Sequence, residues 1–167
     1  MDSELPTAPD LYNYDTDRDA SPGLLITRGG YGVGENDPTK YQAWRTPALP
    51  EALLIGGQVT LKLWSAVKDF DDTKGGAVTV YLRDFDGSSY VELGSGALVD
   101  PQWQGGAPSW TLKTLTFPVE PHVVAAGHSL ELKVIVDSSS GDDMWFAYDS
   151  NAHKSRVTVG TSPQAPR

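Results

Sequence analysis

The 167-residue chain contains no cysteine and few basic residues: 13 Lys and Arg stand against 22 Asp and Glu. The lack of thiols excludes disulfides, thiolate nucleophiles and cysteine zinc sites, but it leaves the cellular compartment open. The formal net charge of −9 would repel a polyphosphate backbone, whose affinity for proteins comes mainly from Lys and Arg. We therefore expect no nucleic-acid partner.

Long apolar runs are also missing. No run approaches the ~20 residues that cross a bilayer, and Met1 is followed by DSELPTAPD instead of a basic and then hydrophobic leader. We expect no membrane insertion. Residues 1–9 and 161–167 are rich in Pro and small polar residues, which predicts linkers on either side of a single domain at 10–160, taken from a longer protein.

Helical spacing of apolar residues with capping signals is absent as well, because Pro or Gly interrupts each long stretch. Within residues 58–67, the apolar Val59, Leu61 and Leu63 instead alternate with Thr60 and the other residues between them. This two-residue period is that of a strand with one buried face. Similar strand patterns recur at 77–85, 90–99, 112–119 and 128–138. Many short strands with turn-rich connections predict an all-β fold, a single antiparallel β-sandwich of the jelly-roll type.

The middle of the chain carries a resemblance. Residues 56–98 hold GQVTLKLWSAV, a polar loop, and AVTVYLRDFDGSS with its D-x-D-G turn, and residues 115–136 include PHVVAAGHSLELKVIV. This order resembles the galactose-binding-like jelly rolls, similar to carbohydrate-binding modules and to the C-terminal accessory domain of X-prolyl dipeptidyl peptidase-like and cocaine-esterase-like hydrolases. Because the α/β-hydrolase domain that accompanies such accessory domains is absent here, the resemblance implies a non-catalytic jelly roll.

Catalytic motifs are weak. The Gly-x-Ser-x-Gly pentapeptide that exposes a nucleophilic serine is missing, and His122, His128 and His153 have nothing local to pair them. We interpret His128 as a turn or capping residue. Because carboxylates are so numerous, a pair suited to glycosidase catalysis can be picked at many places in the sequence, and such pairs give no specific signal. A small hydrolase is therefore a distant third hypothesis.

A metal site has better support. Asp15, Asp17 and Asp19 alternate within NYDTDRDASPG, and alternating carboxylates in a turn can supply the hard oxygen ligands that calcium prefers. An EF-hand loop is rejected, because Ala20 and Ile26 occupy the positions that need Gly and a bidentate Glu.

The resemblance also implies a structural calcium, since galactose-binding-like jelly rolls commonly carry one where the first and last strands meet. It extends the metal ligands to Asp15, Asp17, Asp19 and Asp149. Carboxylates that converge away from water need a cation to offset their desolvation. The alternative is a solvated turn in which the aspartates cap backbone amides and Arg18 partly balances their charge.

Five tryptophans and seven tyrosines raise the question of a sugar platform, because an aromatic face can stack on the C–H face of a pyranose. The residues assigned to ligand binding are Trp103, Trp110, Tyr31 and Gln104. The alternative is that most such aromatics are structural, as we expect for Trp64 and Trp145, which plug a core or pair across strands.

Taken together, these patterns predict a non-catalytic, calcium-stabilised extracellular binding module, with carbohydrate as its expected ligand. The alternative is a structural or adhesive module of a surface fibre or large secreted protein, which would contact neighbouring protein modules through its edge strands.

Overall fold

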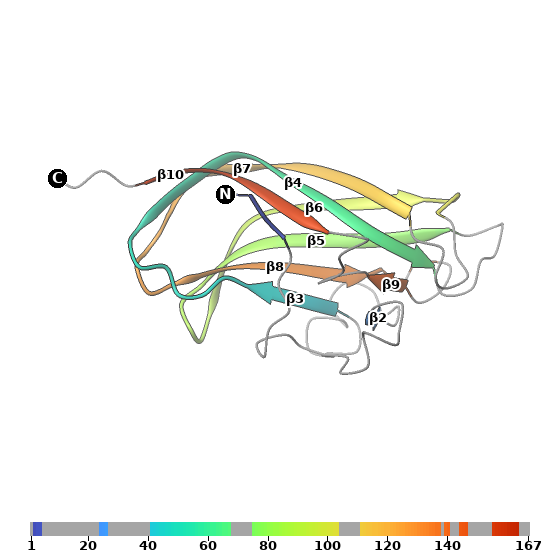
Figure 1. The fold of residues 1–167 in the computed structure, drawn as a ribbon, viewed down its shortest axis with the longest axis horizontal. Helices are drawn as coiled ribbons and strands as arrows, with labels where there is room; N and C mark the ends of the chain where they lie inside the picture. Colours follow the sequence, from blue (N-terminus) through green and yellow to red (C-terminus); the bar gives the residue numbers. More distant parts are fainter. Residues whose placement is uncertain are drawn as a thin grey trace.

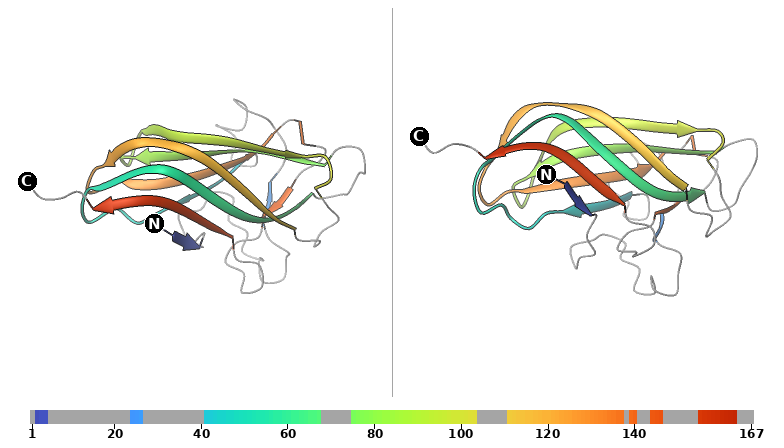
Figure 2. Two further views of the ribbon diagram at one scale, coloured as in Figure 1. Left: turned by 90° about the horizontal axis from the view of Figure 1, so that it is seen from above. Right: turned by 45° about the horizontal axis from the view of Figure 1, so that its top comes forward.

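A computed structural model gives the fold, and it describes residues 2–4, 24–26, 41–67, 75–103, 111–137, 139–140, 144–146 and 155–163. The described chain consists of β-strands and connections without a helix, in a six-stranded and a four-stranded antiparallel sheet. The two sheets lie face to face with their strands along the long axis (Figures 1 and 2). The predicted all-β antiparallel sandwich is therefore confirmed.

The long strand β4 (Leu53–Val67) organises the six-stranded sheet. One edge of β4 pairs with β7 (Thr111–Val124), and the other pairs first with β10 (Arg156–Pro163) and then with β9 (Met144–Phe146). Two short strands complete the sheet: β1 (Asp2–Glu4) pairs with β10, and β2 (Leu24–Ile26) pairs with β9.

The four-stranded sheet has the order β3-β8-β5-β6. Its strands are β3 (Tyr41–Arg45), β8 (Ser129–Val136), β5 (Gly76–Phe85) and β6 (Tyr90–Asp100). The predicted Asp-Gly turn joins β5 to β6: the Asp86 carboxylate accepts hydrogen bonds from the backbone N–H groups of Ser88 and Ser89, and Gly87 has a φ of 107°. These hydrogen bonds hold the pKa of Asp86 well below its ordinary value.

The core lies between the sheets, where the period-two pattern places it. Val59, Leu61 and Leu63 of β4 are buried against the apolar inner faces of β5 and β8. The inner residues of these two strands are Val78, Val80, Leu82, Leu130, Leu132, Val134 and Val136. Each side chain of this size stabilises the fold by roughly 1.5–3 kcal/mol when it leaves water.

Residues near both ends of the chain pair within the six-stranded sheet. Asp2–Glu4, within the expected N-terminal linker at 1–9, pairs as β1 with β10. The strand β10 continues to Pro163, past the boundary expected at residue 160, because its last residues pair with Leu53–Ile55 of β4. Backbone pairing at a sheet edge is compatible with polar, Pro-containing sequence, and the domain limits at residues 10 and 160 stay a prediction.

No helix in the described part of the chain is both long and apolar enough to cross a membrane.

β6 and β7 bring the two sheets into close contact along one side. A Cβ atom built at Gly94 of β6 would lie 2.7 Å from the backbone oxygen of Pro118 in β7, and one at Gly96 would lie 3.1 Å from the Phe117 ring. Real Cβ atoms essentially never lie 2.7 Å from a backbone atom. Glycine is thus required at position 94 by this close approach, whereas a side chain at position 96 would need the Phe117 ring to shift slightly.

We predict that Gly94→Ala destabilises the fold by about 1–3 kcal/mol, because the added methyl group meets backbone that cannot rotate away. Urea unfolding measures the change, with the neighbouring Ser95→Ala, at an exposed position, as the control. Equal unfolding midpoints for the two variants would contradict the close approach of β6 and β7.

Candidate binding site

The outer face of the four-stranded sheet, which points away from the core, carries charged and aromatic side chains. In its register Arg45 of β3 lies opposite Glu131 of β8, which lies opposite Arg83 of β5. Phe85 and Tyr90 form the next pair, across β5 and β6. We call Arg45, Arg83, Phe85, Tyr90 and Glu131 the Arg45–Tyr90 cluster.

Arg45 connects the cluster across three strands. Its Nε atom donates a 2.6 Å hydrogen bond to Glu131 Oε2, and its Nη2 atom donates a 3.0 Å hydrogen bond to the Tyr90 hydroxyl. The guanidinium carbon also lies 4.0 Å from the centroid of the Phe85 ring. Glu131 is only 1% exposed, and a buried carboxylate is tolerated only when it is paired and hydrogen-bonded.

The aromatic rings of the cluster stack beside these charges. The Phe85 and Tyr90 centroids are 4.8 Å apart with an interplanar angle of 28°. The Arg83 guanidinium lies 5.0 Å from the Tyr81 ring and 5.1 Å from the Tyr90 ring, a cation–π arrangement. Tyr90 is 43% exposed, so this stacked pair reaches solvent beside the β5–β6 turn.

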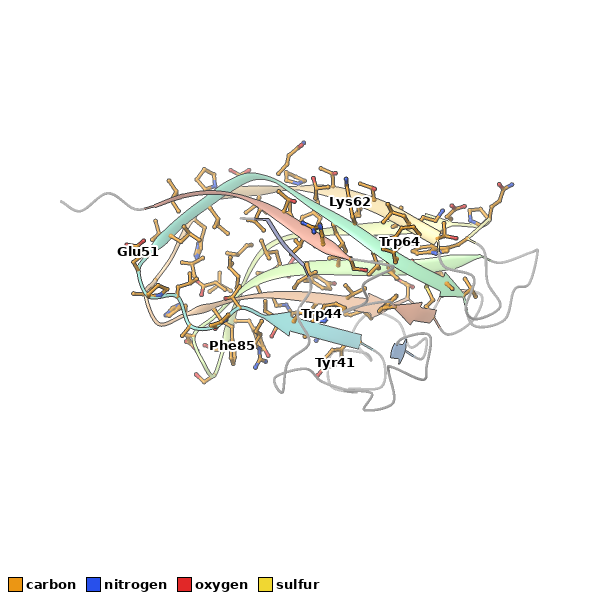
Figure 3. The ribbon with its side chains drawn as sticks, viewed as in Figure 1. Tyr41, Trp44, Glu51, Lys62, Trp64 and Phe85 are labelled. Atoms are coloured by element: carbon orange, nitrogen blue, oxygen red, sulfur yellow. The ribbon has the colours of Figure 1, made fainter. Side chains whose placement is uncertain are left out.

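On strands β3, β5 and β8, much of the outer face beyond the cluster is buried. Tyr41, Tyr81 and Ile135 form a second apolar cluster with Ala43, and the Lys133 Nζ atom lies 4.0 Å from the Tyr41 ring. Tyr41 and Phe85 lie on the opposite side of the sandwich from Lys62 and Trp64 (Figure 3). Of the aromatic rings described on this outer face, Tyr90 is exposed and Phe85 is partly exposed, whereas Tyr41 and Tyr81 are buried.

The structure places one of the predicted ligand-binding residues, Trp103, in the core. Its side chain is 0% exposed and belongs to the main hydrophobic cluster, where its ring covers Gly76 so closely that a Cβ atom there would meet it at 2.9 Å. A buried ring cannot stack on a sugar, so the interpretation of Trp103 as a platform was wrong. The turn residues beside Trp103 in the sequence suggested that its side chain would be exposed. In the structure the indole of Trp103 packs into the space left by Gly76, which has no side chain.

Hydrogen bonds at the end of β6 fix the chain that leads into Trp103. The Trp103 backbone N–H donates to the Asp100 carbonyl, and Lys113 donates to the Asp100 carboxylate. The hydrogen bond from Lys113, followed by that from the Gln102 backbone N–H, lowers the pKa of Asp100.

The other predicted site residues lie outside the described part of the chain. These are the ligand-binding candidates Trp110, Tyr31 and Gln104, and the metal candidates Asp15, Asp17, Asp19 and Asp149. Within the described residues, no group of three or more His, Cys, Asp or Glu side chains could hold a metal ion. Trp64, expected to be structural, is half-buried on β4 and pairs across strands with Leu112 of β7.

A second polar cluster joins the two sheets at the end of the sandwich. The buried Asp84 of β5 has its Oδ2 atom 2.8 Å from His122 Nε2 and its Oδ1 atom 2.7 Å from His128 Nδ1. An ionised carboxylate only accepts, so each ring donates its N–H from that nitrogen. His122 lies in β7 of the other sheet, and this pairing across 38 residues leaves no signal in the local sequence.

We predict that Asp84→Ala lowers the free energy of unfolding by roughly 2–4 kcal/mol, because two hydrogen bonds to a charged group are lost and two imidazoles lose their partner. Denaturant unfolding measures this, with Glu120→Ala at an exposed position of β7 as control. A double-mutant cycle of Asp84 with His122 should give a coupling energy above about 0.5 kcal/mol. Additive effects would contradict the inter-sheet link.

No protein-family model and no curated protein matches this chain, but solved structures do. An aminopeptidase from the marine sediment archaeon Thaumarchaeota archaeon superposes with a TM-score of 0.61 at 13% identity, over 77% of this chain and 27% of its own. A CocE/NonD family hydrolase from Staphylococcus aureus gives 0.60 at 10% identity, over 77% of this chain and 31% of its own.

A third match is the CBM22-2 xylan-binding domain of Xyn10C from Paenibacillus barcinonensis, at 14% identity over 98% of this chain and 99% of its own. Its TM-score is 0.32, which is too low to support an argument about fold or ligand. The chain spans less than a third of the length of the aminopeptidase and of the hydrolase. At these identities the two longer proteins share the fold alone, which confirms the resemblance to the jelly roll of such hydrolases.

Proposed function

We propose that this chain is a non-catalytic binding module and that its ligand is carbohydrate, held at the Arg45–Tyr90 cluster. The observation that carries the proposal is the exposed Tyr90 ring, stacked on Phe85 and hydrogen-bonded to Arg45. An aromatic ring held in a fixed orientation offers an apolar face to a pyranose, while the adjacent polar groups bond its hydroxyls.

The pairing of ionisable groups supports a binding role. Glu131 is engaged by Arg45, and Asp84 is engaged by His122 and His128. A hydrolase triad would need a nucleophile hydroxyl on the second ring nitrogen of such a histidine. In the described part of the chain no serine hydroxyl bonds to either imidazole. The extracellular location inferred from the resemblance remains part of the proposal.

A structural or adhesive module is the second candidate, and the edge strand β6 favours it. Val91 and Val99 of this strand are 54% and 64% exposed, and residues 90–100 contain neither Lys nor Pro, which commonly protect sheet edges. Neighbouring protein modules would then be the partners, with strand β6 as the contact.

We predict that the unmutated protein is retained on a polysaccharide or glycan array and that Tyr90→Ala weakens binding about two- to tenfold, since aromatic stacking contributes roughly 0.5–1.5 kcal/mol. Leu112→Ala is the matched control, because Leu112 is a similarly exposed apolar residue on the other sheet. Thermal unfolding of both variants checks that the fold persists. Failure of the unmutated protein to bind any glycan would refute the carbohydrate proposal.

We also propose a structural calcium held by Asp15, Asp17, Asp19 and Asp149. The support is the alternation of the three early aspartates, a donor set of the hard oxygens that calcium prefers. Such an ion would offset the negative charges of aspartates that come from the early and late parts of the chain.

For calcium, we predict that chelation lowers the melting temperature and that millimolar Ca²⁺ restores it, because an ion that binds the native state selectively stabilises it by mass action. Asp17→Asn should reduce this response, whereas Asp71→Asn, in the separate acidic sequence DFDD at residues 69–72, should leave it unchanged. Melting curves that are identical with chelator and with calcium would remove the metal from the proposal.

A further inference from the structure

We infer that Arg45 is a positioning residue of the proposed carbohydrate site, which acts on the ligand by holding the Tyr90 ring in a fixed orientation. This inference rests on the proposed function, and it adds the residue that prepares the site before the ligand arrives. Three contacts of the Arg45 guanidinium carry it, and each of them reaches a different strand: β8, β6 and β5.

The contact with β8 anchors the guanidinium. The Arg45 Nε atom donates a 2.6 Å hydrogen bond to Oε2 of Glu131, whose side chain is 1% exposed. A buried carboxylate that loses its cationic partner destabilises a protein more strongly than the intact pair stabilises it. Arg45 therefore cannot turn toward solvent without removing this partner from Glu131, and the pair keeps the guanidinium in place.

The contacts with β6 and β5 carry this fixed position to Tyr90. The Arg45 Nη2 atom donates a 3.0 Å hydrogen bond to the Tyr90 hydroxyl, and the guanidinium carbon lies 4.0 Å from the centroid of the Phe85 ring. Phe85 in turn stacks on Tyr90 with a centroid distance of 4.8 Å. The Tyr90 ring is thus held at two points, by Phe85 at its face and by Arg45 at its hydroxyl.

Only a planar group with several N–H donors suits this arrangement. The guanidinium presents its donors in a rigid fork, so one edge can bond a carboxylate while another nitrogen bonds a hydroxyl and the plane lies near an aromatic ring. A lysine ammonium is a compact charge on a flexible chain and lacks this fork. The position therefore distinguishes arginine from lysine, although both carry the same charge.

Tyr90 is a residue whose orientation needs such support. It is the first residue of β6, directly after the β5–β6 turn and on an edge strand of its sheet, and its ring is exposed. A side chain that becomes ordered only when a ligand binds lowers the affinity about two- to tenfold. Because Phe85 and Arg45 restrict the ring beforehand, the ligand has less of this ordering to impose.

The first test is Arg45→Lys, which keeps a positive charge beside Glu131 and removes the fork. Titration calorimetry with cellohexaose, xylohexaose and any further soluble oligosaccharide found on the glycan array should show about two- to fivefold weaker binding, and no greater loss than Tyr90→Ala causes. Arg156→Lys, on β10 of the other sheet, is the matched control and should leave the affinity unchanged.

A double-mutant cycle separates positioning from direct contact with the sugar. Tyr90→Phe keeps the stacked ring and removes the hydroxyl that Arg45 holds. If Arg45 acts through this hydroxyl, Arg45→Lys in the Tyr90→Phe background should weaken binding by less than about 1.5-fold, because the link is already gone. The full loss from Arg45→Lys in that background would overturn the inference.

NMR relaxation of the Tyr90 ring in the ligand-free protein gives a readout that does not depend on binding. The ring should be more mobile in Arg45→Lys and in Tyr90→Phe than in the unmutated protein, and unchanged in Arg156→Lys. Equal mobility in Arg45→Lys and the unmutated protein would overturn the inference while leaving carbohydrate binding in place. If no glycan binds, the proposed function fails, and the relaxation measurement still decides whether Arg45 holds the ring.

Discussion

The apolar inner faces of β4, β5 and β8 are removed from water only when they pack against one another. This constraint determines how the rest of the structure is arranged. Each strand presents alternate apolar residues, so burying one face fixes which residues point outward. Val80 and Leu82 point into the core, and Tyr81 and Arg83 must therefore occupy the outer face. The candidate site follows from core packing, because the same alternation that builds the sandwich also assembles the charged and aromatic face.

Buried charges then determine how this face is organised. Glu131 and Asp84 lie on β8 and β5, but on opposite faces of their sheet. Each is satisfied by side chains from distant parts of the sequence, Glu131 by Arg45 and Asp84 by two histidines. Leaving either carboxylate without partners would cost more than the pairs contribute when intact. These contacts therefore fix β3 relative to β8 and β5 relative to β7 more than they add net stability.

The fold is shared with a domain-sized part of much longer hydrolase and aminopeptidase chains. A sandwich of this kind hosts many functions, so the argument for a role has to come from its site. Here the buried carboxylates of Asp84 and Glu131 are paired with histidine and arginine side chains, while the stacked Tyr90 ring is exposed to solvent. That combination is the basis on which we propose a binding role.

The sequence by itself determined the strands, their inward faces and the antiparallel sandwich, because period-two alternation and Asp-Gly turns act locally. The inward-facing Leu130, Leu132, Val134 and Val136 could be identified in this way. Only the tertiary structure decided that Trp103 fills the space left by Gly76, that Asp84 bonds His122, and that Arg45 meets Tyr90. Strand pairing brings these residues together from positions far apart in the chain, and no local pattern encodes that register.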